Sequence, residues 1–225
     1  VRVSKDFINW EESHMLEYGL DAPDLELYTN NITKYYRAKH MFIGFPTRYV
    51  DRYKDAKNFP KLTDWKHRQA VMDKIEVRSG TAMTDTAIMT SRDGVNFNRT
   101  EEAWCTSGYE RGVNWYYGDG YFAYGMIETK NDLPGGPNEI SMYCATLGDC
   151  ELIRYVTRLD GFFSWHCDAK AGKMVTKPIV FDGDTLSINF ETSALGWIRI
   201  KLLDSNGEYI EGYEKTGFSV GEQAD

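Results

Sequence analysis

The sequence predicts an all-β protein, and two observations support this fold class. Between residues 158 and 213, short runs in which apolar and polar residues alternate are separated by turn sequences such as Asp-Gly, Ala-Gly and Ser-Asn-Gly. Strict alternation buries every second side chain of a strand, and the glycines supply the positive φ angles that tight reversals need. The same strand–turn–strand form recurs earlier in the chain at intervals of about 25–45 residues, as in architectures built from repeated β-units.

The first third of the chain is predicted to contain two strands and one helix. Residues 1–25 read as connecting structure, and strands are expected near residues 25–30 and 40–49. A polar, charged excursion follows, and within it we predict a short helix at residues 64–75. Asp64 is its expected N-cap, because an aspartate side chain accepts hydrogen bonds from the first free N–H groups of a helix.

Hairpins dominate the middle of the chain. Strands are predicted at residues 87–91 and 95–98, on either side of an Arg-Asp-Gly turn, and residues 113–128 and 138–159 repeat this form. Radial arrays of four-stranded blades produce such a pattern. Residues 1–157 are therefore predicted to form β-propeller blades.

The predicted domains are both incomplete. A closed propeller needs at least four blades of about 40–50 residues each, so residues 1–157 supply only about three. We expect either a longer polypeptide or another closed arrangement of the β-units, because open sheet edges are usually avoided. Residues 158–225 are predicted to form a C-terminal β-sandwich that also lacks strands.

Composition and charge exclude some partners. The 225 residues carry a net charge of -8, with a pI near 5.1, and no cluster of lysines and arginines is present. Nucleic-acid binding relies on basic patches, so no nucleic-acid partner is expected. No apolar run approaches the roughly 18 residues of a membrane span. Aromatic residues make up 14% of the chain, which fits β-structure and also a stacking surface for sugar rings.

The sequence predicts no metal and no cofactor. The cysteine spacing does not match a metal site, and the known nucleotide-binding and nucleophile motifs are absent. Cys105, Cys144, Cys150 and Cys167 contain no Cys-x-x-Cys pair, and no histidine lies at metal-site spacing from them. A disulfide between Cys144 and Cys150 and a set of four free thiols are both compatible with the sequence. No Gly-x-Ser-x-Gly, phosphate-binding loop or Gly-x-Gly-x-x-Gly motif occurs.

Three segments carry a resemblance to a known group of proteins. They are YRAKHMFIGFPTRYVDR at 36–52, DTAIMTSRDGVNFNRTEEAW at 85–104, and residues 139–213, which include RLDGF at 158–162 and T-K-P-x-x-F-x-G-x-x-L-x-x-N at 176–189. These segments resemble the later blades and the appended β-sandwich of bacterial proteins related to glycoside hydrolase families 32 and 43 and to the sialidase-like propellers. The last segment is the most specific of the three.

The resemblance implies a five-bladed catalytic propeller followed by a β-sandwich, with a sugar-binding funnel at the propeller axis. It also implies an aspartate nucleophile or base in the first blade, within a Trp-Asn-Asp-Pro-like motif. That motif is absent from the 225 residues, as are the Arg-Asp-Pro and Glu-Cys motifs of family 32. The catalytic candidates are therefore chosen from their local context.

Two carboxylates are the candidates for catalysis, since glycoside hydrolysis needs one acid and one nucleophile or base that face the same bond. Asp85 precedes an apolar strand whose end would face the propeller axis, and Glu102 follows Glu101 close to Trp104. Apolar cover at such a position favours the protonated acid that the leaving group requires. The alternative is that Asp85 serves a strand-entry turn and that Glu102 is a solvated surface acid.

Substrate binding is predicted for Arg37, His40, Arg48 and Trp115. The first three form the densest polar cluster in a strand-like stretch, and such side chains bind sugar hydroxyls or a carboxylate. Trp115 begins a Trp-Tyr-Tyr run whose rings suit the apolar faces of sugars. The alternative is that the arginines lie on the surface, that the histidine is structural and that the aromatic run packs in the core.

The sequence therefore predicts a carbohydrate-active protein with an oligosaccharide or glycoside as its substrate. The first hypothesis is a glycoside hydrolase that uses paired carboxylates. The alternatives are a non-catalytic carbohydrate-binding module, which needs no acid pair, and a structural domain that supports a neighbour.

Overall fold

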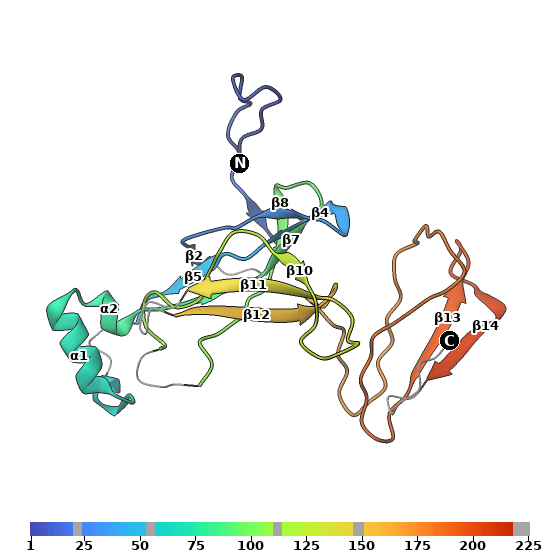
Figure 1. The fold of residues 1–225 in the computed structure, drawn as a ribbon. Helices are drawn as coiled ribbons and strands as arrows, with labels where there is room; N and C mark the ends of the chain where they lie inside the picture. Colours follow the sequence, from blue (N-terminus) through green and yellow to red (C-terminus); the bar gives the residue numbers. More distant parts are fainter. Residues whose placement is uncertain (20–23, 53–56, 110–113, 146–150, 218–225) are drawn as a thin grey trace. The chain divides into compact units, whose positions relative to one another are not determined.

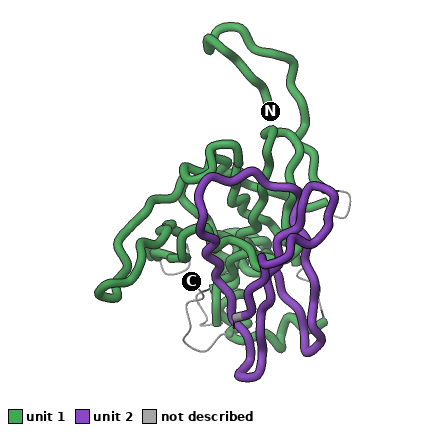
Figure 2. Tube along the Cα trace, turned by 90° about the vertical axis from the view of Figure 1, so that its right-hand side faces the viewer, with its two compact units in different colours: residues 1–164 green, residues 165–225 purple. Residues whose placement is uncertain are grey.

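The computed structural model describes residues 1–19, 24–52, 57–109, 114–145 and 151–217. These residues form many strands and few helices, which confirms an all-β protein with several sheets (Figure 1). The chain divides into two compact units, residues 1–164 and 165–225 (Figure 2). No sheet in the described ranges closes into a barrel, and a propeller is not confirmed.

The largest sheet has five strands in the order β1-β8-β7-β4-β3. Its strands are β1 (Glu17–Tyr18), β3 (Thr33–Tyr35), β4 (Ala38–Gly44), β7 (Met89–Ser91) and β8 (Asn96–Arg99). The last four pair antiparallel, whereas β1 runs parallel to β8 at the edge. The hairpin predicted around the Arg-Asp-Gly turn is thus confirmed as β7 and β8.

Phe45 and Pro46 divide the strand that was predicted at residues 40–49. Proline has no N–H to donate to a ladder, so regular pairing stops there. The Pro46 carbonyl still accepts a hydrogen bond of 3.0 Å from Ala87 N–H, which joins the two sides of the break. Beyond it, β5 (Thr47–Val50) lies between β2 (Glu26–Leu27) and β6 (Met83–Thr86) in a three-stranded sheet.

A third sheet is centred on β11 (Glu139–Ala145). β11 pairs along its whole length with β12 (Leu152–Arg158), which confirms the hairpin predicted at residues 138–159. Its other edge pairs with β9 (Tyr121–Phe122) and β10 (Ile127–Thr129). The side chains of β12 alternate between half-buried and exposed, as the period of a one-sided strand requires.

The prediction of a strand at the start of residues 113–128 is wrong. Residues 114–120 instead form a turn, which we call the buried turn because Asn114, Tyr116 and Asp119 within it are almost inaccessible to solvent. Trp115 has a φ of 65° and Gly120 a φ of 72°. Left-handed backbone of this kind cannot belong to a strand, so the chain reverses here before β9.

One apolar cluster packs the first sheets against the sheet of β9 to β12. Its buried members come from β3, from β4 and the β4–β5 junction, from the β6–β7 junction, and from β9 and β11. They are Tyr35, Ile43, Phe45, Ile88, Phe122, Ile140, Met142 and Cys144. Burial of apolar area is the main favourable term in folding, so this cluster is what makes residues 1–164 one unit.

The helix predicted at residues 64–75 is confirmed as α1 (Trp65–Lys74), and it is flanked by two short helical turns. These are η1 (Phe59–Lys61) and α2 (Arg78–Thr81). Asp64 is at the N-cap position, but its φ is 55° and its side chain makes no capping hydrogen bond. Packing holds the helix instead: a Cβ on Gly80 would lie 2.4 Å from Met72 Cγ, so only glycine allows α2 to approach α1 so closely.

The two packed sheets of the predicted C-terminal sandwich are absent from the described part of residues 158–225. Only β13 (Ile198–Leu203) and β14 (Tyr209–Gly217) pair, and no strand occurs at 165–197. The apolar side chains of this alternating segment are expected to fill a core, but Val180 and Phe181 are exposed. An alternating pattern forms a strand only where a second layer covers its apolar side, and the described residues of this unit provide no such layer.

Truncating the core of the first unit should destabilise it strongly. Met142 on β11 is 1% exposed, so Met142→Ala removes packing and leaves a cavity, and we expect the free energy of unfolding to fall by about 2–5 kcal/mol. Ile127→Ala on the paired strand β10 is the matched control, because Ile127 is exposed and should contribute only about 0.5 kcal/mol. Urea denaturation of both variants measures the difference, and equal losses would contradict this account of the core.

Candidate functional site

Arg48 and Asp85 face each other on β5 and β6 and form a buried ion pair. Arg48 Nε donates to Asp85 Oδ1 at 2.8 Å and Nη2 donates to Oδ2 at 2.7 Å, a bidentate geometry. Asp85 is only 2% exposed. The hydrogen bonds to Asp85 raise the pKa of Arg48 above its usual value, so the guanidinium is permanently charged.

The second predicted catalytic residue, Glu102, lies in the segment after β8 and is exposed. Arg48 Nη1 donates to the backbone carbonyl of the adjacent Glu101 at 2.7 Å, and therefore holds this segment beside Asp85. Both oxygens of Asp85 are occupied by Arg48, so Asp85 acts as a fixed acceptor in this arrangement. Of the two carboxylates, Glu102 is the one that solvent reaches.

Threonines on the same two strands bind the buried turn. Thr84 Oγ1 donates to the Asp119 carbonyl at 2.6 Å and accepts from Gly118 N–H at 2.9 Å. The hydroxyls of Thr47 and Thr86 both donate to the Gly120 carbonyl. The hydroxyl groups of these three threonines are therefore all hydrogen-bonded to the buried turn. The sequence predicted none of them, because a strand threonine gives no sign of its distant partner.

Trp115, predicted to bind substrate, is half-buried within the buried turn. Its backbone N–H donates to Asp119 Oδ2 at 2.6 Å, and the indole Nε1–H donates to the Gly108 carbonyl at 2.7 Å. Arg68 from α1 donates to the Trp115 carbonyl at 3.0 Å and stacks over the Tyr116 ring at 4.2 Å. Trp115 and Tyr116 thus help to join the helical excursion to the sheets.

Four tyrosines gather at one surface of the first unit and form what we call the tyrosine cluster: Tyr28, Tyr49, Tyr117 and Tyr121. The Tyr28 ring lies 5.5 Å from Tyr49, 5.8 Å from Tyr117 and 6.3 Å from Tyr121 between centroids. Arg78 lies 4.9 Å above the Tyr117 ring and donates to the Tyr28 hydroxyl at 3.4 Å. Tyr28 is 45% exposed, and the other three rings are half-buried.

Three hydroxyls of the tyrosine cluster, those of Tyr28, Tyr49 and Tyr121, have raised pKa values and stay protonated over the physiological range. A hydrogen bond with Tyr117, followed by burial, raises the pKa of Tyr28 to about 12. Burial also raises the pKa of Tyr121. Each of these three phenols therefore keeps both a donor and an acceptor. Of the four, sequence reasoning had noticed only Tyr117, as part of the Trp-Tyr-Tyr run, because the others lie far apart in the chain.

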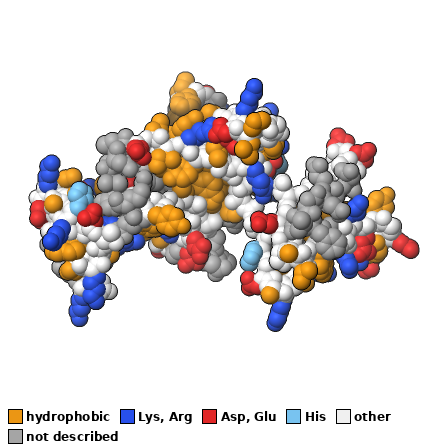
Figure 3. All heavy atoms as spheres, turned by 60° about the horizontal axis from the view of Figure 1, so that its bottom comes forward, with side chains coloured by type: hydrophobic (Ala, Val, Ile, Leu, Met, Phe, Trp, Pro, Cys, Tyr) orange, Lys and Arg blue, Asp and Glu red, His pale blue; other side chains and the backbone are white. Residues whose placement is uncertain are grey.

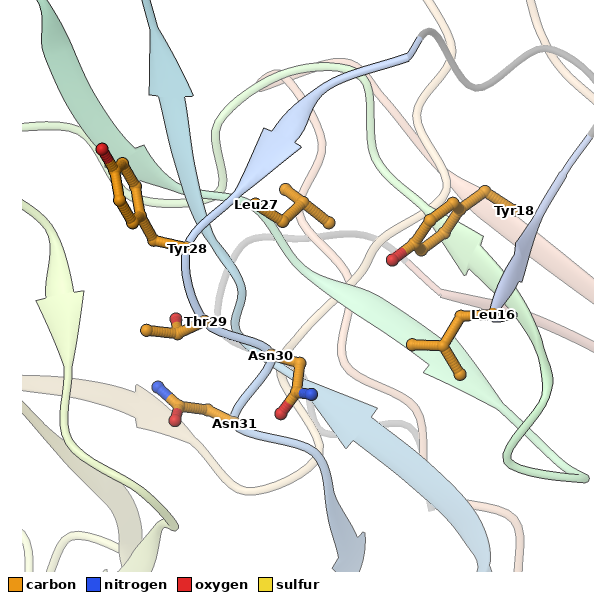
Figure 4. A pocket seen from close by; sticks show the side chains of 7 residues that line it. All are labelled: Leu16, Tyr18, Leu27, Tyr28, Thr29, Asn30 and Asn31. Atoms are coloured by element: carbon orange, nitrogen blue, oxygen red, sulfur yellow. The ribbon is translucent and has the colours of Figure 1, made fainter. Parts of the chain in front are cut away.

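An open pocket of about 400 Å³ adjoins the tyrosine cluster and shares Tyr28 with it. Its lining consists of Leu16, Tyr18, Leu27, Tyr28, Thr29, Asn30 and Asn31. In Figure 4, Leu27 and Asn30 project toward Tyr18 and Leu16, whereas Tyr28 and Thr29 project from the opposite side of their segment. The volume lies in the range of small-molecule sites, about 300–1,000 Å³. Amides, hydroxyls and leucines together suit a polar organic ligand.

Arg37 and His40 do not share a partner with Arg48. Arg37 Nε donates to both oxygens of Asp160, at 3.1 and 3.2 Å, and the Tyr35 hydroxyl donates to Asp160 Oδ1 at 2.6 Å. This network ties the β3–β4 turn to the turn after β12. His40 is exposed on β4, outside the polar contacts of the described residues. The structure thus does not gather the predicted substrate-binding residues into one site.

The thiols of Cys105, which is half-buried, and of Cys144, which is buried, are unsuited to nucleophilic chemistry. Cys105 and Cys144 line a cavity of about 20 Å³ together with Tyr155, which is room for a single water. Burial raises the pKa of Cys105, and it raises the pKa of Cys144 to about 12, so both remain protonated at neutral pH. Cys105, Cys144 and Cys167 are free, and Cys150 lies outside the described residues.

Neither sign of charge dominates the face of the molecule that Figure 3 draws. On the face drawn in Figure 3, basic and acidic side chains are interspersed. Within the described ranges, no three His, Cys, Asp or Glu side chains come together as metal ligands would. None of the helices in the described part of the chain has the length and apolar character to span a bilayer.

Comparisons with protein-family models, with curated proteins and with solved structures found no match. The function therefore has to be argued from the geometry of the chain itself.

Removing the charge of Asp85 should affect stability before it affects any chemistry. Asp85→Asn breaks a buried, bidentate ion pair and leaves Arg48 uncompensated, so we expect the free energy of unfolding to fall by about 3 kcal/mol. Glu102→Gln, at the other predicted catalytic position, should change it by less than about 0.5 kcal/mol. Urea titrations compare the two. An Asp85→Asn variant as stable as the unaltered chain would contradict a structural role for this pair.

Acid should weaken the network around Asp160. Burial tends to raise the pKa of Asp160, but hydrogen bonds from Arg37 and Tyr35 outweigh it and the net shift is downward. A carboxyl whose pKa is lower in the folded state stabilises the fold above its unfolded value, near 3.9, and that contribution disappears as the pH falls through the folded value. Asp160→Asn should therefore be less stable than the unaltered chain at pH 7 and approach it near pH 3.

Unfolding free energies at both pH values test this account. Glu12→Gln is the control, because Glu12 is an exposed carboxyl for which the structure gives no hydrogen bond or ion pair. A stability difference for Asp160→Asn that stays constant from pH 7 to pH 3 would contradict it.

Proposed function

We propose that the first unit binds a carbohydrate at the tyrosine cluster and the adjoining pocket. The observation that supports this function is the part-exposed Tyr28 ring, which is flanked by three further tyrosines, together with the adjoining open pocket of about 400 Å³ that Tyr28 helps to line. Sugars present C–H faces that pack on aromatic rings, and hydroxyls that pair with groups such as the phenols and Asn30.

The charge of the surface favours a neutral sugar. Arg78 is the cation beside the cluster, but Glu76 accepts a hydrogen bond from its Nε at 2.6 Å, so the pair carries no net charge. Acidic side chains also lie near enough to Tyr49 to raise its pKa after the larger effect of burial, Asp51 and Glu26 among them. An anionic ligand would meet repulsion here, whereas a neutral glycan would not.

The site is supported by a rigid base, which lowers the cost of binding. Tyr117 belongs to the buried turn, whose backbone is fixed by the hydroxyls of Thr47, Thr84 and Thr86. Tyr49 lies on β5 and pairs directly with Thr84 on β6. Binding at pre-ordered aromatic rings loses little conformational entropy, so modest contact areas still give measurable affinity.

Glycoside hydrolysis is the second candidate function. It is favoured by the resemblance to glycoside hydrolase proteins and by Arg48, which holds Asp85 and the segment of Glu101 and Glu102 together. The engagement of Asp85 with Arg48 weighs against it, since a catalytic carboxylate must reach the substrate. We therefore rank carbohydrate binding first.

Loss of the central ring should reduce sugar binding. Tyr28 contacts each of the other three tyrosines, so Tyr28→Ala should weaken binding of a neutral oligosaccharide about tenfold, equivalent to about 1.4 kcal/mol. Tyr124→Ala is the matched control, because Tyr124 is exposed and outside the cluster. A glycan array identifies the ligand and calorimetry measures both variants. Equal affinities in the two variants, or no glycan bound at all, would overturn the proposal.

The same sample separates binding from hydrolysis. The chain is incubated with a panel of aryl glycosides and with the oligosaccharide from the array. Release of the aryl group that is lost in Glu102→Gln would favour the hydrolase. Binding without turnover would favour the non-catalytic function.

A further inference from the structure

Arg78 and Glu76 form an ion pair at the rim of the tyrosine cluster. They belong to the helical excursion of η1, α1 and α2, which leaves the sheet after β5 and returns to it at β6 (Figure 1). Arg78 Nη1 donates to the Tyr28 hydroxyl at 3.4 Å, and the guanidinium lies 4.9 Å from the centre of the Tyr117 ring. The ion pair is therefore placed directly beside Tyr28, the most exposed ring of the cluster.

The backbone that carries the ion pair is fixed by local contacts. Ser79 N–H donates to the Glu76 carbonyl at 3.1 Å, and Ala82 N–H donates to the Arg78 carbonyl at 2.9 Å. A Cβ on Gly80 would lie 2.5 Å from a carbonyl oxygen of α1, so glycine allows α2 to lie directly against α1. Side chains that project from a fixed backbone lose less conformational entropy when they bind a ligand.

The ion pair leaves one donor and one acceptor unused. Arg78 Nε donates to Glu76 Oε1 at 2.6 Å, and Arg78 Nη1 is engaged with Tyr28. Within the described part of the chain, Arg78 Nη2 and Glu76 Oε2 have no hydrogen-bond partner, and they do not bond each other. We call these two groups the half-open fork. The Arg78 and Glu76 side chains are 46% and 47% exposed, so a ligand can reach both groups.

The buried pair of Arg48 and Asp85 shows how the same fork looks when it is closed. Arg48 uses Nε and Nη2 for the two oxygens of Asp85, so both halves of its fork are occupied. Arg78 uses Nε for one oxygen of Glu76, and the Nη2 half stays open. Since Nε and Nη2 are on the same side of a guanidinium, the open half presents a donor beside a carboxylate acceptor.

We propose that the half-open fork binds two adjacent hydroxyl groups of the sugar that packs on Tyr28. One hydroxyl donates to Glu76 Oε2, and its neighbour accepts from Arg78 Nη2. Given the carbohydrate function proposed for the tyrosine cluster, on which this assignment rests, the ligand is a neutral glycan with a free vicinal diol. Hydrogen bonds to charged groups are about twice as strong as neutral ones, so this contact selects among sugars that all pack on the same ring.

Ligand groups of a single polarity fit the half-open fork less well. A carboxylate or sulfate accepts from Arg78 but is repelled by Glu76, and an ammonium group is repelled by Arg78. A deoxy position that faces Glu76 has no proton to donate, which leaves the carboxylate covered without a partner. A vicinal diol uses both halves at once, because each hydroxyl is both a donor and an acceptor.

Removal of the Glu76 carboxylate tests this contact. The probes are neutral tetrasaccharides of glucose, galactose, mannose and xylose, titrated by calorimetry into the 225-residue chain. Glu76→Ala should weaken binding of the best of these tetrasaccharides about tenfold, because it removes the acceptor for one hydroxyl. Asp73→Ala is the matched control, since Asp73 is an exposed carboxyl of the same excursion that pairs with Gln69 on α1. Its loss should change the affinity less than about twofold.

Deoxy derivatives separate a direct contact from a structural effect. Among monodeoxy derivatives of the bound tetrasaccharide, two with the change at adjacent carbons should bind the unaltered chain about tenfold more weakly than the parent. Glu76→Ala should bind the parent and one of these two derivatives equally, because the hydroxyl that is missing no longer has an acceptor. A Glu76→Ala variant that still discriminates against both derivatives would overturn the assignment.

The same titrations distinguish failure of the diol contact from failure of the carbohydrate function. Binding that Tyr28→Ala weakens and Glu76→Ala leaves unchanged would overturn the diol contact alone, and sugar binding at the tyrosine cluster would stand. Binding of none of the tetrasaccharides by the unaltered chain would overturn both.

Discussion

The first unit depends on how β5 and β6 are bound on their two faces. Alternation along these strands places Arg48 and Asp85 on one face and Thr47, Thr84 and Thr86 on the other. The ion pair reaches the carbonyl of Glu101, and the threonine hydroxyls reach the buried turn. Such buried polar groups are stable only when they are all satisfied, so neither partner segment can move without exposing unpaired groups.

This arrangement explains why the buried turn can have the backbone that it has. Gly120 approaches so closely that a Cβ would lie 2.9 Å from the Asp85 Cα, and its φ of 72° is open to glycine at little cost. Trp115 is left-handed without being glycine, and the hydrogen bond from its N–H to Asp119 offsets that strain. The turn then delivers Tyr117 to the tyrosine cluster and the chain to β9. Structure and candidate site thus share one support.

The sequence correctly predicted the elements whose structure depends mainly on neighbouring residues. The Arg-Asp-Gly turn between β7 and β8 and the hairpin of β11 and β12 follow from turn residues and alternation, and α1 follows from its polar excursion. The break at Pro46, the buried turn and the tyrosine cluster depend on contacts between distant segments, which no window of sequence contains. For residues 165–197 the sequence predicted strands that the structure does not contain. Their apolar and polar residues alternate clearly, but alternation indicates only which side of a strand would be buried if a second layer were present.

The same reasoning bears on the function. Arg37, Arg48 and Asp85 attracted attention as charged residues in apolar surroundings, and each is engaged with another charged side chain. Ion-paired groups of this kind perturb local electrostatics as strongly as catalytic ones, which is why charge alone does not separate the two roles. The tyrosine cluster differs because its central ring is open to solvent and its cation, Arg78, is already neutralised by Glu76. Under the proposed function, recognition there would rest on ring faces and phenol hydroxyls, and these groups discriminate ligands by shape and hydrogen bonding instead of charge.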